Sequence, residues 1–194
     1  MVALEHQSRS FDDLDSAHDW FAAYFPERRF GVDDAGRFHV RVRLSTAGRF
    51  SFIDSAWTAP GTATGGTEDL TVISGEGRDY HLTHGPTDLD PCQPLLAPVE
   101  GLSVRWDERR SSVVALEFAA VERIARVATG NDGLRLRRTG LVANSPETLD
   151  EWSSVLGAVR SSLDREPDLL DAPLVANATF HRLATAFLHA FPTN

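Results

Sequence analysis

Hydrophobic and polar residues alternate with a period of two through the middle of the chain, which is the pattern of strands with one buried face. The alternation is unbroken from Arg37 to Leu44, and a second strand follows the turn at Gly48. Glycine and proline turn signals separate the segments at intervals typical of an all-β barrel or sandwich. The predicted strands lie in residues 37–44, 49–55, 70–73, 80–83, 102–106 and 112–118, with a mobile loop at 59–67 and a turn at 75–77.

Helical spacing replaces this pattern towards both ends of the chain. Ser10 to Asp13 has the form of a capping box, and the apolar residues that follow share one helical face until Pro26. After Phe118 the pattern again predicts a helix, with Gly130 as its C-terminal stop. Leu134 to Arg137 alternates briefly, which indicates a short strand.

Two further helices are predicted after residue 143. Ser145, Pro146 and Glu147 provide a cap, a first-turn proline and an acidic residue at the helix start, and Pro173 opens the second helix. Both helices carry apolar residues at a and d heptad spacing, which fits packing within one subunit as well as pairing with a second copy. The candidate dimer-interface residues are Leu149, Trp152, Leu156, Val159, Leu163, Phe180, Leu183 and Phe187.

Composition narrows the function classes. The 194 residues include 19 Lys+Arg, all of them arginine, and 28 Asp+Glu, for a formal charge of −9. Without lysine the chain cannot bind phosphate as a P-loop does and cannot form a Schiff base. An acidic chain with scattered arginines is also unsuited to binding DNA itself. The N-terminus is not a signal peptide and no apolar run is long enough for a membrane helix, so we expect a cytoplasmic protein without membrane contact.

The sequence offers candidate ligand contacts but no catalytic set. The polar row of the first long strand, His39, Arg41 and Arg43, is either a solvated face or the lining of a barrel that holds an anionic or sugar ligand. Aromatic residues near strand ends are either core or pocket walls. The candidate ligand-binding residues are therefore His39, Arg41, Arg43, Trp57, Tyr80 and Trp106.

Other reactive residue types carry weaker signals. His81 and His84 are three apart, so on one strand their rings point to opposite faces, and we expect neither a metal site nor another cofactor. Cys92 has no histidine partner and is interpreted as a buried structural thiol. Arg105, Arg109 and Arg110 are interpreted as a solvated cluster. No Gly-x-Ser-x-Gly elbow occurs, so no catalytic residue is assigned.

Three stretches together resemble a known family. Arg9 to Ala17 followed by Tyr24-Phe25-Pro26, Cys92 to Pro98 followed by Leu102 to Trp106, and the apolar and proline positions of Leu149 to Pro192 carry the resemblance. The layout is similar to the N-terminal sensing and dimerisation half of AraC/XylS-type transcription regulators, in the form common in actinobacteria. The match spans nearly the whole chain but consists of apolar and proline positions rather than a chemical signature.

The resemblance implies an α+β fold with a cupin-like β-barrel of the jelly-roll type, preceded by one helix and followed by C-terminal helices. It divides the chain into an N-terminal helix packed on the barrel (1–30), a sensing barrel (31–142) and dimerisation helices (143–194). The family's helix-turn-helix module is expected to be absent from this chain, so DNA would be contacted only through a further C-terminal domain. The implied function is effector binding and homodimerisation without catalysis.

Two rival hypotheses belong to other classes. The first is a metal-dependent cupin enzyme that uses His39, His81 and His84. The second is a stand-alone module that binds another protein.

Overall fold

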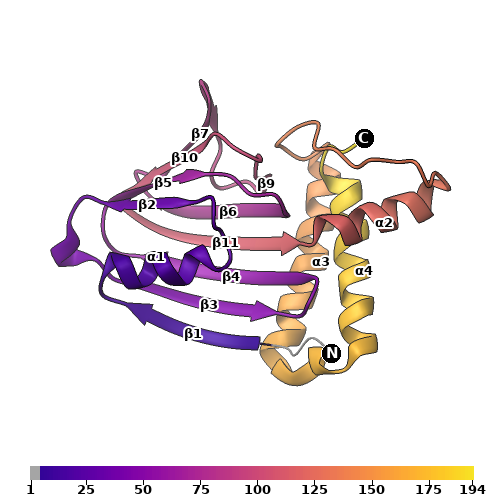
Figure 1. Cartoon of the computed structure of the whole chain (residues 1–194), viewed down its shortest axis with the longest axis horizontal. Coiled ribbons are helices and arrows are strands. Elements are labelled where there is room, and N and C mark those ends of the chain that lie inside the picture. The colour runs from indigo at the N-terminus through magenta and orange to yellow at the C-terminus, as the bar shows by residue number, and fades with distance from the viewer. Residues whose placement is uncertain (1–4) are drawn as a thin grey trace.

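Eleven strands and four α-helices make up residues 5–194, the part of the chain that the computed structural model describes (Figure 1). The strands form two antiparallel sheets, of six and five strands. The larger sheet has the order β1 (Glu5–Phe11), β3 (Val40–Thr46), β4 (Phe50–Trp57), β11 (Glu108–Leu116), β6 (Leu70–Arg78) and β9 (Leu95–Leu96). The smaller has the order β2 (Arg29–Val32), β5 (Gly61–Gly65), β10 (Leu102–Trp106), β7 (His81–His84) and β8 (Thr87–Leu89). The helices are α1 (Leu14–Ala22), α2 (Phe118–Thr129), α3 (Pro146–Arg165) and α4 (Pro173–Ala190).

The sheets do not close on each other. No ladder joins the larger sheet to the smaller one within residues 5–194, so β1 and β9 end the first sheet and β2 and β8 end the second. The expected α+β class is confirmed, whereas the expected closure into a barrel is wrong and the jelly-roll type stays a prediction. The sequence pattern left a sandwich open as an alternative, because alternation reports which face is buried and not whether the outer strands meet.

The larger sheet buries its inner face and part of its outer face. On β3 the inward residues Val40, Val42 and Leu44 are buried between the sheets, while Arg41 and Arg43 are exposed on the outer face. On β4 and β11 one half of the outer face is apolar as well, and it packs against the C-terminal helices. The outer-face residues in this second core are Phe50, Phe52, Leu70, Val72, Val114 and Leu116.

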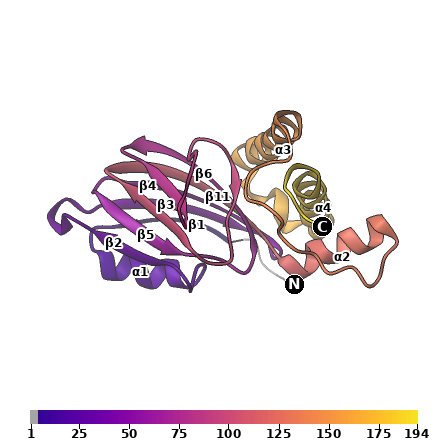
Figure 2. The same cartoon turned by 90° about the horizontal axis from the view of Figure 1, so that it is seen from above.

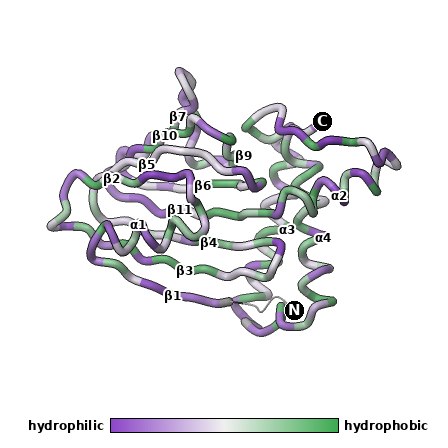
Figure 3. The backbone as a smooth tube through the Cα atoms, viewed as in Figure 1, coloured by the Kyte–Doolittle hydropathy of each residue, from purple (hydrophilic) through white to green (hydrophobic). Residues whose placement is uncertain are grey.

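The three C-terminal helices gather at one end of the strands, whereas α1 lies beside the other end (Figures 1 and 2). β11 explains this arrangement, because it begins with Glu108 and two arginines and ends in an apolar run to Leu116. Figure 3 shows the hydrophobic part of β11 where the strand reaches the helices. The polar half of the outer face remains uncovered beyond them.

The helix seam predicted for a dimer is occupied within one subunit. Six of the eight residues are buried in the core between α3, α4 and the sheet, and Leu149 and Leu156 are half-buried against the same core. The six buried residues are Trp152, Val159, Leu163, Phe180, Leu183 and Phe187. A second copy would therefore have to meet other residues of these helices.

The N-terminal segment differs from its prediction. Residues Glu5–Phe11 form a strand that pairs with β3, and the helix begins later, with Asp13 as its cap. The Asp13 side chain accepts a hydrogen bond from the Ser16 backbone N at 2.7 Å, so Ser10 is not part of a capping box. The helix starts at 145 and 173 and the stop at Gly130, which has φ +64°, are confirmed.

Two segments predicted as loop and turn are strands. Gly61 is the first residue of β5, and only a glycine fits at this position. A Cβ would lie 2.5 Å from the Gly31 carbonyl oxygen and 3.0 Å from the Trp106 ring. Residues 75–77 continue β6 beside β11. The glycines of both segments allow neighbouring strands and side chains to approach closely. Because glycine is also common in turns, the sequence pattern predicted a loop and a turn here. Leu134 to Arg137 does not form a strand.

We expect Phe187→Ala to lower the free energy of unfolding by about 3–5 kcal/mol, because it empties a fully buried site. The Phe187 ring lies 5.4 Å from that of Phe191 and 6.4 Å from that of Trp152, measured between centroids. Leu174→Ala is the control, since Leu174 at the start of α4 is 84% exposed and its loss should change stability by less than about 0.5 kcal/mol. Urea unfolding measures both, and equal losses would contradict the assigned core.

Candidate functional site

Two arginines lie in the space between the sheets. Arg109 is on β11, where it is paired in register with Trp57, and it faces inward with Ser111 and Val113 because alternate residues share a face. Arg28 immediately precedes β2 and approaches the same space from the side of α1. Only 7% of Arg109 and 8% of Arg28 is exposed, although arginine is rarely buried unless it is paired.

Aromatic rings cover the flat faces of both guanidinium groups. The Arg109 Cζ lies 3.8 Å from the Trp106 ring centroid and 4.8 Å from that of Trp57. The Arg28 Cζ lies 4.8 Å from the Phe25 ring centroid. Such contacts stabilise a desolvated cation by about 2 kcal/mol, but they leave the N–H groups around the edge of each guanidinium unsatisfied.

The N–H groups at these edges lack acceptors. Nε and Nη2 of Arg28 and Nε of Arg109 are buried without a hydrogen-bond partner. Among the ion pairs within residues 5–194, none involves either arginine. A buried cation without a counter-ion is costly, so these donors mark a place where the fold provides charge and leaves it uncompensated.

Burial lowers the pKa of Arg28 and the pKa of Arg109, each to about 10. For both groups Tyr80 acts in the opposite direction, and for Arg109 the positive charge of Arg28 adds to the lowering. A pKa of about 10 is still well above neutrality, so both groups are protonated at pH 7. The interior therefore holds two positive charges next to one phenol.

A hydrogen-bond network fixes the walls around this pair. Trp57 Nε1 donates to Ser55 Oγ at 3.0 Å, and Ser55 Oγ lies 2.9 Å from Ser111 Oγ. Trp106 Nε1 donates to the carbonyl oxygen of Ala59 at 3.0 Å. Because both indoles are satisfied at their edges, their faces are held in position for Arg109.

The two arginines border a cavity of about 20 Å³, enough for one or two water-sized atoms. Tyr80 reaches it over Gly75, where a Cβ would lie 2.9 Å from the Tyr80 ring, so glycine is needed to admit the phenol. Most of the remaining wall is apolar. The lining residues are Phe21, Phe25, Arg28, Phe30, Ile53, Ser55, Ile73, Tyr80, Val104, Arg109, Ser111 and Val113.

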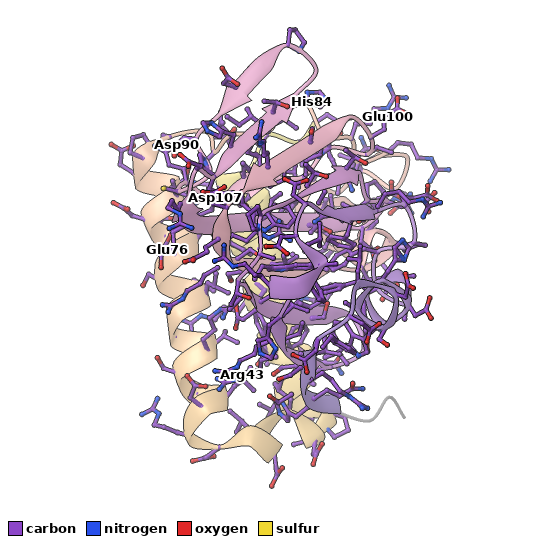
Figure 4. All side chains as sticks on the ribbon, turned by 90° about the vertical axis from the view of Figure 1, so that its left-hand side faces the viewer. Arg43, Glu76, His84, Asp90, Glu100 and Asp107 are labelled. Atoms are coloured by element: carbon purple, nitrogen blue, oxygen red, sulfur yellow. The ribbon has the colours of Figure 1, made fainter. Side chains whose placement is uncertain are left out.

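The uncovered outer face of the larger sheet is a second hollow region. Two adjoining grooves of about 600 and 670 Å³ share Arg41, Glu76 and Arg110 in their lining. Figure 4 looks onto this end of the molecule, with Arg43 and Glu76 labelled. Arg41, Arg43 and Arg110 in these linings are exposed, as expected for a solvated face, whereas the larger groove also borders the buried Arg109 beside Trp57.

α3 is clamped to the same outer face. Arg160 Nη1 donates to both carboxylate oxygens of Asp54, at 2.9 and 2.7 Å, and Nη2 donates to Ser112 Oγ at 2.6 Å. Asp54 and Ser112 directly precede and follow the inward-facing Ser55 and Ser111 on their strands. The α3 clamp and the interior network are therefore attached to neighbouring residues on opposite faces of the sheet.

The structure separates the six candidate ligand contacts into two groups. Trp57, Tyr80 and Trp106 lie around the interior arginines. Arg41 and Arg43 point to the outer face, and His39 Nδ1 lies 2.6 Å from Asp12 Oδ1.

Sequence reasoning missed Arg28 and misassigned Arg109 as solvated. The signal for Arg109 is the inward series Arg109, Ser111, Val113, which becomes visible once the strand is extended back to Glu108.

Metal-ligating and nucleophilic residues do not gather. His81 and His84 lie on β7 in the smaller sheet, and within residues 5–194 no group of three or more metal-binding side chains occurs. Cys92 is exposed, so its interpretation as a buried thiol is wrong. No helix of residues 5–194 combines the length and apolar character required to cross a bilayer.

Comparison with known proteins gives a likeness in fold. No family model matches the chain, and no curated protein is similar to it in sequence. The crystal structure of the AraC-like transcriptional activator CuxR is similar, with a TM-score of 0.61 and 9% identity over 97% of this chain and 72% of that chain. At this identity the likeness concerns the fold alone.

We expect Arg28→Met to raise the free energy of unfolding at pH 7 by about 1–3 kcal/mol, because it removes an unpaired buried charge. The folded-state pKa of about 10 is below the ordinary 12.5, so the penalty is complete below about pH 10 and declines at higher pH. Arg109→Met should raise the free energy of unfolding by less, because it also loses two contacts between the guanidinium and aromatic rings. Urea unfolding at pH 7 measures both, and a loss of stability in Arg28→Met would reveal a compensating partner.

Proposed function

We propose that this chain is the ligand-sensing and dimerisation part of an AraC-type transcription regulator and is not an enzyme. The observation that carries the proposal is the buried pair Arg28 and Arg109 beside a cavity, where Nε and Nη2 of Arg28 and Nε of Arg109 have no hydrogen-bond partner within residues 5–194. The likeness to an AraC-like activator supports the regulator class. The site gathers charge and aromatic walls but no nucleophile beside a base, which favours binding over catalysis.

The larger sheet provides the proposed path from ligand to helices. A ligand at the arginines contacts the inner face near Ser55 and Ser111, and the adjacent Asp54 and Ser112 hold Arg160 of α3 on the outer face. A small shift of β4 or β11 therefore alters the contacts of α3. The ligand would favour one arrangement of the helices by its difference in affinity for the two states.

The proposed homodimer uses the solvent-facing sides of the C-terminal helices, since their apolar seam is buried. On α3 this side carries small residues, among them Ser154 and Ala158, which permit close approach of a second helix. DNA would be contacted by a further domain, whose position depends on how the helices pair.

We expect a screen of small metabolites, charged and neutral, to yield at least one that raises the melting temperature and slows hydrogen exchange in α3. In Arg160→Met the ligand should still raise the melting temperature, but the protection of α3 should be lost, because its polar clamp to Asp54 is gone. Arg165→Met, at the exposed end of α3, is the control. Absence of any stabilising metabolite in a broad screen would contradict the sensing function.

We expect Ala158→Arg to convert the dimer to a monomer without unfolding it, because a long cation then projects from the exposed side of α3. Val127→Arg on α2 is the control, since Val127 is 80% exposed and lies outside the proposed contact. Light scattering after size exclusion gives the mass. A wild-type monomer at high concentration would contradict dimerisation by this chain.

A further inference from the structure

We propose that the interior site binds the carboxylate of a small organic acid, held between Arg28 and Arg109 with the Tyr80 hydroxyl beside them. This inference rests on the proposed sensing function and adds the chemical class of the ligand. It is carried by three independent properties of the site, namely its charge, its size and the character of its walls.

The charge of the site requires an anion. Two guanidinium groups are almost completely buried, and no side-chain carboxylate of residues 5–194 forms an ion pair with either of them. Aromatic rings cover their faces, so the edges remain available, with Nε and Nη2 of Arg28 and Nε of Arg109 as unpartnered donors. A guanidinium edge is the geometry that pairs with two oxygens of a carboxylate. A neutral ligand would leave the like-charge repulsion of the pair uncompensated.

The size of the site selects among anions. The cavity of about 20 Å³ admits one or two water-sized atoms, which corresponds to the two oxygens of a carboxylate. A phosphate or sulfate brings four oxygens and is too large for this space.

The walls indicate the rest of the ligand. Phe21, Phe25 and Phe30 lie on the side of α1 and β2, and Ile73, Val104 and Val113 complete an apolar lining. Such a surface suits a hydrocarbon body and offers little to a sugar or a nucleotide. Since the cavity has room for the head group alone, the body must displace part of the α1 side, where Phe21 lines the cavity and Phe25 lies against Arg28. The binding therefore loosens or shifts α1.

The test compares acids with their amides, which share shape but not charge. Sodium butyrate and sodium phenylacetate are titrated into the whole chain at pH 7 in a chloride-free buffer, alongside butyramide, phenylacetamide, sodium chloride and sodium phosphate. The readouts are melting temperature and isothermal calorimetry. We expect at least one acid to bind saturably and raise the melting temperature by roughly 5 °C at high occupancy, and neither amide to do so.

Three substitutions locate the binding. Arg28→Met and Arg109→Met should each weaken binding of the acid roughly tenfold or more, and Tyr80→Phe, which removes only the hydroxyl, should weaken it several-fold. Arg110→Met is the matched control, because Arg110 is the next residue on β11 and points to the outer face. If Arg28→Met is more stable than the wild type yet no longer responds to the acid, the loss of response is not a loss of folding.

The results that overturn this inference are distinct from those that overturn the sensing function. Equal binding of acids and amides, equal effects of chloride or phosphate, or loss of binding in Arg110→Met would each reject a carboxylate site at these arginines. No response to either acid would reject it as well. If a neutral metabolite from the wider screen then binds and protects α3, the sensing function stands while the carboxylate assignment falls.

Discussion

The core of this β-sandwich buries two guanidinium groups, those of Arg28 and Arg109, without counter-ions among residues 5–194. The cores of β-sandwiches do not normally contain such groups, and the surrounding structure depends on stabilising them. Trp57, Trp106 and Phe25 reduce the penalty by covering the flat faces of the cations. Ser55 and Ala59 in turn hold the two indoles in place. This support involves residues from both sheets and their connections, so the arrangement is built by the whole sandwich rather than by one loop. The proposed ligand site would explain why the fold gives up stability to maintain this charge.

The larger sheet is a wall shared by two cores, which gives the site a mechanical connection to the helices. Its inner face forms the aromatic and arginine core, and half of its outer face forms the core with α2, α3 and α4. A change of one face necessarily moves side chains of the other, because alternate residues of the same strands supply both. Arg160 adds a polar contact between the sheet and α3 to the apolar ones, because it donates hydrogen bonds to Asp54 and Ser112. These two residues are the sequence neighbours of the interior pair Ser55 and Ser111.

Sequence periodicity predicted the strands with large alternating side chains and the helices with clear caps, such as β3, β10 and α3. It failed at β5 and in the second half of β6, where glycine serves close packing: Gly61 lies under Trp106 and Gly75 under Tyr80. The sequence also could not predict whether the sheets close into a barrel or which surface covers the apolar seam of α3 and α4. Periodicity identifies a buried face without identifying what covers it. Trp57, Tyr80 and Trp106, which the sequence offered as candidate ligand contacts, do lie around the interior arginines, while their role in binding stays a prediction. The arginines themselves were not predicted, because a charged residue is assigned to solvent by default.

The burial of the helical seam changes how a signal from the interior can reach a partner. If the seam itself joined two copies, a ligand would have to compete with the hydrophobic core of a dimer. In the observed fold, Phe180 and Phe187 bind α4 to its own sheet, so α3 and α4 stay attached whether or not a second copy is present. In the proposed homodimer the exposed sides of the helices would form a smaller and more polar contact. Its strength would be closer to the roughly one to three kcal/mol that coupling to a ligand supplies. A weak contact of this kind is easier to regulate than an apolar seam, because a modest shift of α3 is enough to change it.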